Sequence, residues 1–265
     1  MPSEVRHQVD GGQAYPVVRL TGMLDAATAP IVRSWLIDLL AAQPEAVIVD
    51  VRELTVGDPG AGAVLGEVAR DTTGWPSARI LLTTGPDAAA EGGTGPAAWR
   101  EAGLPLWPTV EQAVTALGAP EPRHFLHARM EPVIGTARRA RELVTEACAR
   151  WDLPDLAGPA CIVVTEMVNN VIAHAHTPMT VMLARHDGRM SVAVRDESTH
   201  VPHFTGGPVP VTSYGGRGLL LIDSVARTWG SLVLAGGKVV WAVLDPRDQP
   251  GNQLPSTGMA GQARG

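Results

Sequence analysis

Apolar residues in the first half of the chain recur alternately at the spacing of strands and at the spacing of helices. Short β-branched runs between turn residues predict strands, and apolar residues at every third or fourth position predict helices. The predicted strands are 17–22, 46–54, 78–85 and 105–109, and the predicted helices are 28–42, 60–71, 97–104 and 110–117. This alternation predicts one sheet covered by helices, an α/β domain that spans residues 1–118.

After residue 118 the order of the elements changes. Residues 119–124 contain two prolines and few apolar side chains, so a linker is expected there. Two long helices are expected next, followed by hairpins that turn at Asp187-Gly188 and Gly236-Gly237. The predicted helices are 133–153, 157–176 and 217–230, and the predicted strands are 179–188, 189–197 and a hairpin over 231–244. This order predicts an α+β sandwich over residues 125–245, with a disordered Gly- and Pro-rich tail over 246–265.

The composition excludes several classes of function. The chain has 265 residues, of which 45% are hydrophobic, and its 21 basic and 27 acidic residues give a net charge of -6. Because the basic residues form no cluster, nucleic acid and an anionic membrane are not expected as partners. The two cysteines cannot form a disulfide framework, and no signal peptide or apolar run of about 18 residues is expected. A cytoplasmic protein is therefore predicted.

Residues 165–176, TEMVNNVIAHAH, combine a helical apolar pattern with unusual polar residues. Asn is a mediocre helix former, so its repeated use needs a reason other than helix stability. Glu166, Asn170 and His174 are spaced by four positions and are expected along one helical face. An Asn oxygen can complete the shell of a magnesium ion, and a carboxylate one turn away can deprotonate a hydroxyl. Such side chains can equally form a solvated face, and the helix alone does not decide between the two.

Two further features follow this helix in the sequence. Asp196 ends a predicted strand, where its carboxylate could accept a hydrogen bond from the exocyclic amine of adenine. The segment GGRGLLLID then enters a helix, and Gly216 and Gly218 would let a phosphate approach the free N–H groups of its first turn. Arg217 stands between them and could reach the phosphates of ATP. In combination with the helix, these features predict a site for ATP and magnesium.

This ordered set of motifs resembles the GHKL-type (Bergerat) ATP-binding fold of gyrase and histidine kinases. It is most similar to the anti-sigma-factor serine/threonine kinases of bacterial partner-switching systems, over about residues 125–244. The resemblance implies Glu166 as general base, Asn170 as magnesium ligand and Asp196 as the carboxylate that recognises adenine. It also implies that Gly216 and Gly218 form the far end of a nucleotide lid, that His174 supports the helix, and that a homodimer is compatible with the family.

The chain departs from the family pattern at two places. Ser198 and His200 stand where a DxGxG pattern would have glycines, and Val239 stands where many members have a threonine that completes the adenine network. The 19 residues from Ser198 to Gly216 are too many for an ordinary connection, so they are expected to form a lid.

The first half resembles STAS domains, the fold of anti-sigma-factor antagonists, in segments 21–36, 46–54 and 99–117. In the antagonists a D-S-S-G segment follows the central strand, and one of its serines accepts phosphate from the kinase family named above. Here that segment reads Asp58, Pro59, Gly60 and Ala61, and it contains no hydroxyl. Thr55 is a poor replacement because it is expected in the strand. The attached domain is therefore expected either to dock as a regulatory unit or only to stabilise the fusion.

These inferences favour a regulator that phosphorylates Ser or Thr of a separate STAS-type antagonist and so controls a sigma factor. A nucleotide-gated binding protein without transfer, and a nucleotide-free scaffold, remain alternatives. The basic residues Arg138, Arg139 and Arg141 form either a solvated helical face or a contact for an acidic partner. The His174-His176 and His200-His203 pairs lack the Cys or carboxylate neighbours of a zinc site, so no metal other than magnesium is expected.

Overall fold

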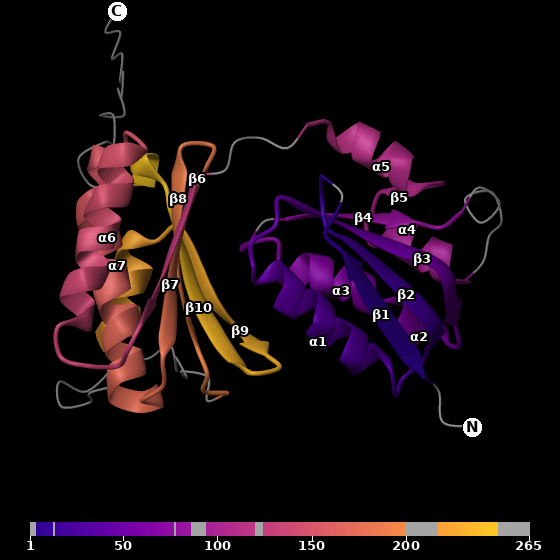
Figure 1. Cartoon of the computed structure of the whole chain (residues 1–265), viewed down its shortest axis with the longest axis horizontal. Coiled ribbons are helices and arrows are strands. Elements are labelled where there is room, and N and C mark those ends of the chain that lie inside the picture. The colour runs from indigo at the N-terminus through magenta and orange to yellow at the C-terminus, as the bar shows by residue number, and fades with distance from the viewer. Residues whose placement is uncertain are drawn as a thin grey trace, which may run out of the picture. The chain divides into compact units, whose positions relative to one another are not determined.

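The structure is a computed structural model that describes residues 4–12, 14–76, 78–85, 94–119, 124–199 and 217–248. The chain divides into two compact units, with Met1–Arg123 in the first and His124–Asp196 in the second. The described residues contain two five-stranded sheets (Figure 1).

The first sheet has the strand order β1-β2-β3-β4-β5. Its strand β1 pairs antiparallel with β2, whereas β2, β3, β4 and β5 run parallel to one another. The strands are β1 (Val5–Asp10), β2 (Val17–Leu24), β3 (Ala46–Val56), β4 (Arg79–Thr83) and β5 (Leu106–Trp107). The helices are α1 (Ala29–Leu40), α2 (Pro59–Gly62), α3 (Val64–Asp71), α4 (Thr94–Glu101) and α5 (Val110–Leu117). Residues 46–51 of β3 are all buried, as expected of a central parallel strand.

The predicted α/β class of this half is confirmed, with two differences in its elements. The strand β1 is missing from the prediction because most of its residues are polar and exposed, which leaves no alternating apolar pattern. The single helix predicted over 60–71 is wrong, because the chain forms α2 and α3 with a break at Ala63.

The second sheet has the order β6-β7-β8-β10-β9, and α6 and α7 lie side by side along one of its faces (Figure 1). The strands are β6 (His124–Met130), β7 (Met179–His186), β8 (Arg189–Asp196), β9 (Thr228–Leu234) and β10 (Gly237–Leu244). The helices are α6 (Thr136–Arg150), α7 (Ala157–Asn170) and α8 (Arg217–Val225), with a π-helical turn over Val171–Ala175 and short 3-10 turns over Pro154–Leu156 and Pro246–Asp248. The predicted α+β class is confirmed.

Three boundaries in this half differ from the prediction. The strand β6 was not predicted, and it is an edge strand with only Met130 fully buried. The helix predicted over 217–230 is too long, since α8 ends at Val225 and β9 begins at Thr228. The first hairpin turns at Asp187 and Gly188 as predicted, with φ angles of 50° and 73°. The second hairpin turns one residue earlier than predicted, because β10 already begins at Gly237.

A buried carboxylate fixes the end of β10. The side chain of Asp245 is 1% exposed, and it accepts hydrogen bonds from Arg189 Nε at 2.9 Å and from the backbone N–H of Arg247 at 3.0 Å. Burial raises the pKa of Asp245, but the hydrogen bonds from these two arginines outweigh burial and hold this pKa at about 2. The carboxylate is therefore charged in the folded protein at neutral pH.

One prediction about membranes needs correction. The helical stretch Pro154–Ala175 is 22 residues long with a mean hydropathy of 1.5, so it could cross a membrane by length and composition. Its apolar residues Val163, Val164 and Val168 are 0% exposed in the core of the second unit. Packing against the sheet therefore explains the hydropathy of this helix.

Candidate functional site

The carboxylate of Glu166 lies against the first turn of α8. Glu166 is half-buried on α7, and a Cβ added at Gly218 would lie 2.7 Å from its Oε2 atom. Gly218 is the second residue of α8, where the first-turn N–H groups have no partner within the helix. The structure thus brings together two residues predicted for the ATP site, and a side chain larger than glycine at position 218 would displace the Glu166 carboxylate.

Asn170 is the last residue of α7 and is half-buried. Within the described parts of the chain, neither its amide nor the Glu166 carboxylate makes a hydrogen bond or an ion pair. Both polar groups are therefore available to a ligand. An amide oxygen and a carboxylate one helical turn apart suit a magnesium ion and a hydroxyl, respectively, so these residues fit the predicted chemistry.

The helical face predicted from Glu166 to His174 does not continue as an α-helix. Val171–Ala175 form a π-helical turn, in which the N–H of His176 donates to the carbonyl oxygen of Val171 at 2.8 Å. His174 lies in this turn and is exposed. π-Helical turns are rare and are frequent at functional sites, so this one marks the end of α7 as unusual.

Asp196 is the last residue of β8 and is 2% exposed. It lies opposite Met179 at the start of β7, and α7 packs against β8. A carboxylate at this depth needs hydrogen bonds to remain charged, and the amine of an adenine is a suitable donor. Asp196 thus ends a strand as the sequence predicts, and its role toward adenine stays a prediction.

The remaining predicted residues are only partly described. Gly216 and most of the predicted lid, residues 200–216 with His200 and His203, lie outside the described residues, and of Arg217 only the backbone is described, as the first residue of α8. Val239 is fully buried in β10. A residue missing from the prediction is Lys238, which is buried and donates from Nζ to the carbonyl oxygen of Ser198 at 3.2 Å. A lysine at the start of an otherwise apolar strand is the signal that could have identified it.

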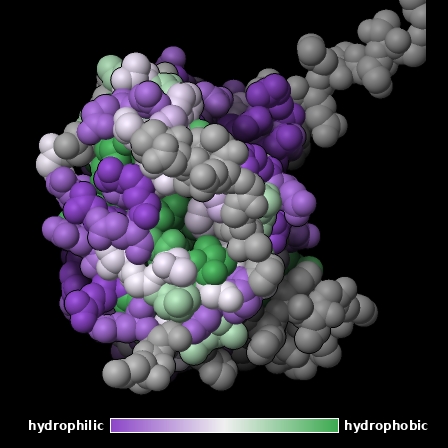
Figure 2. Space-filling view, turned by 90° about the vertical axis from the view of Figure 1, so that its right-hand side faces the viewer, coloured by the Kyte–Doolittle hydropathy of each residue, from purple (hydrophilic) through white to green (hydrophobic). Residues whose placement is uncertain are grey.

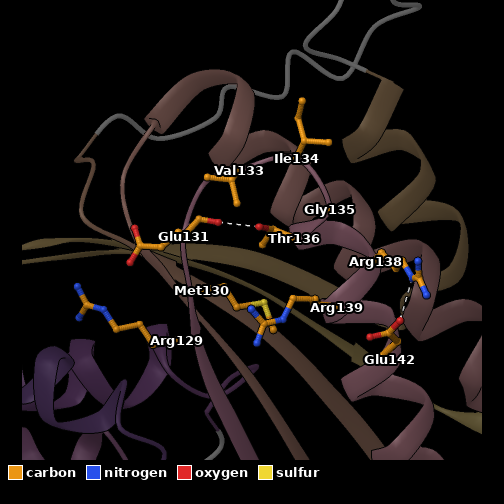
Figure 3. Close-up of a pocket in the computed structure, with 10 residues that line it drawn as sticks. All are labelled: Arg129, Met130, Glu131, Val133, Ile134, Gly135, Thr136, Arg138, Arg139 and Glu142. Atoms are coloured by element: carbon orange, nitrogen blue, oxygen red, sulfur yellow. Dashed lines mark hydrogen bonds and ion pairs between the residues drawn. The ribbon is translucent and has the colours of Figure 1, made fainter.

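A pocket of about 590 Å³ lies between β6 and the start of α6 (Figure 3). Val133 and Ile134 stand on its rim and are 57% and 102% exposed. The guanidinium groups of Arg129, Arg138 and Arg139 also line it, and Arg138 pairs with Glu142 at 2.9 Å. No residue predicted for nucleotide binding lines this pocket, so it is distinct from the Glu166 site.

The prediction of a basic face on α6 is wrong for one of its three arginines. Arg141 is half-buried, and its Nη1 donates to Thr165 Oγ1 at 3.2 Å across the interface between α6 and α7. Arg139 is exposed and has no ion pair within the described residues. Arg138 and Arg139 are therefore the exposed arginines of this face, while Arg141 connects α6 to Thr165, the residue before Glu166.

In the first unit the segment from Asp58 to Ala61 begins a helix. Asp58 caps α2 by accepting a hydrogen bond from the N–H of Ala61 at 2.8 Å. Thr55 is exposed near the end of β3, in the strand as expected. Neither position supplies a hydroxyl to the Asp58–Ala61 turn.

Comparisons with known proteins bear on the second unit. Residues 131–244 match the histidine kinase-like ATPase domain. The match begins directly after β6 and ends with β10. An uncharacterized protein of Streptomyces coelicolor is 42% identical over 69 residues, which cover 25% of this chain and 66% of that protein, so the chain spans just under two thirds of this relative.

Two solved structures resemble parts of the chain. An anti-sigma factor antagonist from Mycobacterium paratuberculosis has 21% identity and a TM-score of 0.35, over 44% of this chain and 96% of that one. The RsbU and RsbW domains of a Mycobacterium tuberculosis protein have 20% identity and a TM-score of 0.33, over 48% of this chain and 32% of that one.

Proposed function

We propose that this protein is a cytoplasmic partner-switching regulator whose second unit transfers the γ-phosphoryl group of ATP to a serine or threonine of a separate STAS-type antagonist. By controlling that antagonist it would control a sigma factor. The observation that carries the proposal is the Glu166 carboxylate, which has no partner among the described residues and lies against Gly218, one turn before the equally unpaired Asn170. This arrangement lies within the segment that matches an ATPase domain.

Each residue has one task in the proposed reaction. Asn170 would hold magnesium through its amide oxygen, and Asp196 would accept a hydrogen bond from the adenine amine. Glu166 would take the proton of the acceptor hydroxyl while that oxygen bonds to the γ-phosphorus and the bond to ADP breaks. Magnesium, when bound, neutralises the charge that develops on the phosphate oxygens. The chain thus positions the reactants and supplies one proton acceptor.

The pocket at the start of α6 would dock the protein partner. An isoleucine that is wholly exposed beside a second exposed apolar residue is unusual for a surface without a partner. Arg139, which has no ion pair within the described residues, favours a partner that presents an acidic side chain beside an apolar one. We therefore assign to this surface an antagonist with an acidic patch.

The docking surface can be tested separately from the nucleotide site. Substitutions Ile134→Asp and Arg139→Glu should each weaken antagonist binding about tenfold or more, because each places a negative charge opposite the acidic patch. Arg150→Glu at the far end of α6 is the matched control and should leave binding unchanged. Isothermal titration with a purified STAS-type antagonist measures all three, and equal affinities for Ile134→Asp and the control would contradict the docking surface.

Nucleotide binding is tested with two variants of the full chain. Asn170→Ala should weaken magnesium-dependent ATP binding about tenfold or more, because it removes a ligand of the ion. Glu166→Gln should bind ATP as the unmodified protein does. If the unmodified protein binds no ATP, the proposal fails. If it binds ATP but transfers no phosphate, the nucleotide-gated binding protein is the better description.

A further inference from the structure

The first unit contains a cavity of about 440 Å³ between the end of α3, the strand β4 and the helix α5. Most of its lining is apolar, including Ile80, Leu104 and Leu117. Figure 2 shows hydrophobic side chains, in green, exposed between hydrophilic ones, in purple, on one face of the molecule. The volume and the lining are in the range of small-molecule sites, which combine apolar walls with a few placed polar groups.

Close packing of α3 against the turn after α4 shapes one wall of this cavity. A Cβ at Gly66 would collide with the side chain of Ala102 and would lie 3.4 Å from Nη1 of Arg70. Arg70 is exposed, so its guanidinium lies at the rim of the cavity. It makes no hydrogen bond or ion pair within the described ranges, whereas Arg79 at the same cavity is paired with Glu45 at 2.9 Å.

A second unmatched donor is the indole of Trp107. Its Nε1 atom is buried and has no hydrogen-bond acceptor among the described residues, and Trp107 lines the cavity. An indole N–H can only donate, so it calls for an acceptor atom. A buried donor without an acceptor destabilises the fold, and a ligand oxygen would offset that loss.

The edge of β4 provides a third donor. Successive N–H groups of a strand point to opposite sides. Arg79 N donates to Glu45 on the β3 side at 3.0 Å, while Leu82 N donates to Pro105 on the β5 side at 2.9 Å. By this alternation the N–H of Ile80 points to the side of β4 on which β5 lies. At the level of Ile80, however, β5 has not yet begun, because its first residue is Leu106. No described residue outside the sheet accepts this N–H there, and Ile80 lines the cavity.

We infer that this cavity binds a small carboxylate with an apolar body, such as a medium-chain carboxylic acid. The three unmatched polar groups are all donors and one of them is a cation, so they select an anion rather than a neutral or cationic head. The apolar body would lie against Ile80, Leu104 and Leu117. By binding such a ligand, the first unit could receive a signal without a phosphoacceptor hydroxyl. The inference is independent of the ATP site.

Isothermal titration of the full chain with octanoate tests the inference, with octan-1-ol as the uncharged probe. Octanoate should bind saturably, and Arg70→Gln should weaken it about tenfold while leaving octan-1-ol unchanged, because only the carboxylate needs the cation. Ala116→Trp should abolish binding of both probes by filling the cavity. Arg33→Gln is the control, because Arg33 is a half-buried arginine on α1 that pairs with Asp71 and does not line the cavity; this variant should bind both probes as the unmodified chain does.

Three results would overturn the inference: no saturable octanoate binding, equal octanoate affinity in Arg70→Gln and the unmodified chain, or full binding by Ala116→Trp. Ala116 is exposed on α5, so tryptophan there is compatible with the fold, and an unchanged unfolding temperature verifies this.

Discussion

A single methyl group at position 218 would reach the carboxylate of Glu166. The Cβ of an alanine there would lie 2.7 Å from Oε2, a distance that real contacts do not tolerate, so the carboxylate must move. An alanine in a helix otherwise stabilises by about 1 kcal/mol relative to glycine. The effect on activity and the effect on stability therefore have opposite signs.

Gly218→Ala should lower phosphoryl transfer about tenfold or more without lowering the unfolding temperature, because it displaces the proton acceptor. Gly158→Ala is the control on the helix of Glu166, since nothing lies within 4 Å of its added Cβ. It should leave transfer unchanged. Initial rates of label transfer and thermal unfolding measure both effects, and a Gly218→Ala variant as active as Gly158→Ala would contradict the assigned contact.

The Asp245 carboxylate makes stability depend on pH. Its pKa of about 2 in the folded chain is below the ordinary value of 3.8. Its stabilisation is therefore fully present above about pH 4 and is lost as the pH falls through about 2. Asp245→Asn should lower the free energy of unfolding by about 2 kcal/mol at neutral pH, because hydrogen bonds to a charged group are replaced by weaker ones.

Urea denaturation at about pH 7 and about pH 2.5 measures this difference, which should shrink at the lower pH. Asp248→Asn is the control, because the side chain of Asp248 is 40% exposed and it pairs only at the surface with Arg227. It should cost less than about 1 kcal/mol. An Asp245 effect that is the same at both pH values would rule out its charged hydrogen bonds as the cause.

At the scale of elements, α6 and α7 pack through residues that include both cysteines. Cys148 on α6 is 1% exposed, and burial, followed by the nearby Cys161, raises the pKa of its thiol to about 11. Cys161 on α7 is half-buried, near Thr145. Iodoacetamide at about pH 8 should therefore modify Cys161 first, and Cys148 only after unfolding, because the thiolate is the reactive form. Mass spectrometry of the alkylated chain measures the order, and early modification of Cys148 would show that the two helices pack less tightly.

The elements that sequence patterns predicted are those with a buried side. The strand β3 and the helix α7 each bury one or both faces in a hydrophobic core, so apolar residues recur regularly along their sequences. The two missed strands, β1 and β6, are edge strands of their sheets and have one buried residue each. An edge strand forms because its neighbour offers hydrogen bonds, and the apolar pattern of its own sequence carries little of that information.

The same distinction applies to the site. Glu166 and Asn170 were expected on one helical face because one helix carries both at a spacing of four. The π-helical turn after Asn170, the hydrogen bond between Arg141 and Thr165, and the burial of Lys238 depend on residues distant in sequence or on local backbone geometry. Spacing along one helix contains no information about them. The sequence assigns Glu166 and Gly218 to one ATP site, but it predicts no direct contact between them.

At the scale of the whole chain, the two units differ in the groups that they could contribute to phosphoryl transfer. The second unit would hold ATP and a proton acceptor, whereas the first has no hydroxyl in the turn from Asp58 to Ala61. The attached unit is therefore not expected to be the substrate of the transferase. Phosphate should go to a separate chain that retains a serine in this turn.

The most direct test is label transfer. The full chain is incubated with magnesium, γ-labelled ATP and a separate STAS-type antagonist that contains the D-S-S-G segment. The account predicts label on the antagonist with the unmodified chain, none with Glu166→Gln, and none on the turn from Asp58 to Ala61. Transfer by Glu166→Gln at the unmodified rate, or no transfer to any such antagonist despite ATP binding, would contradict the account.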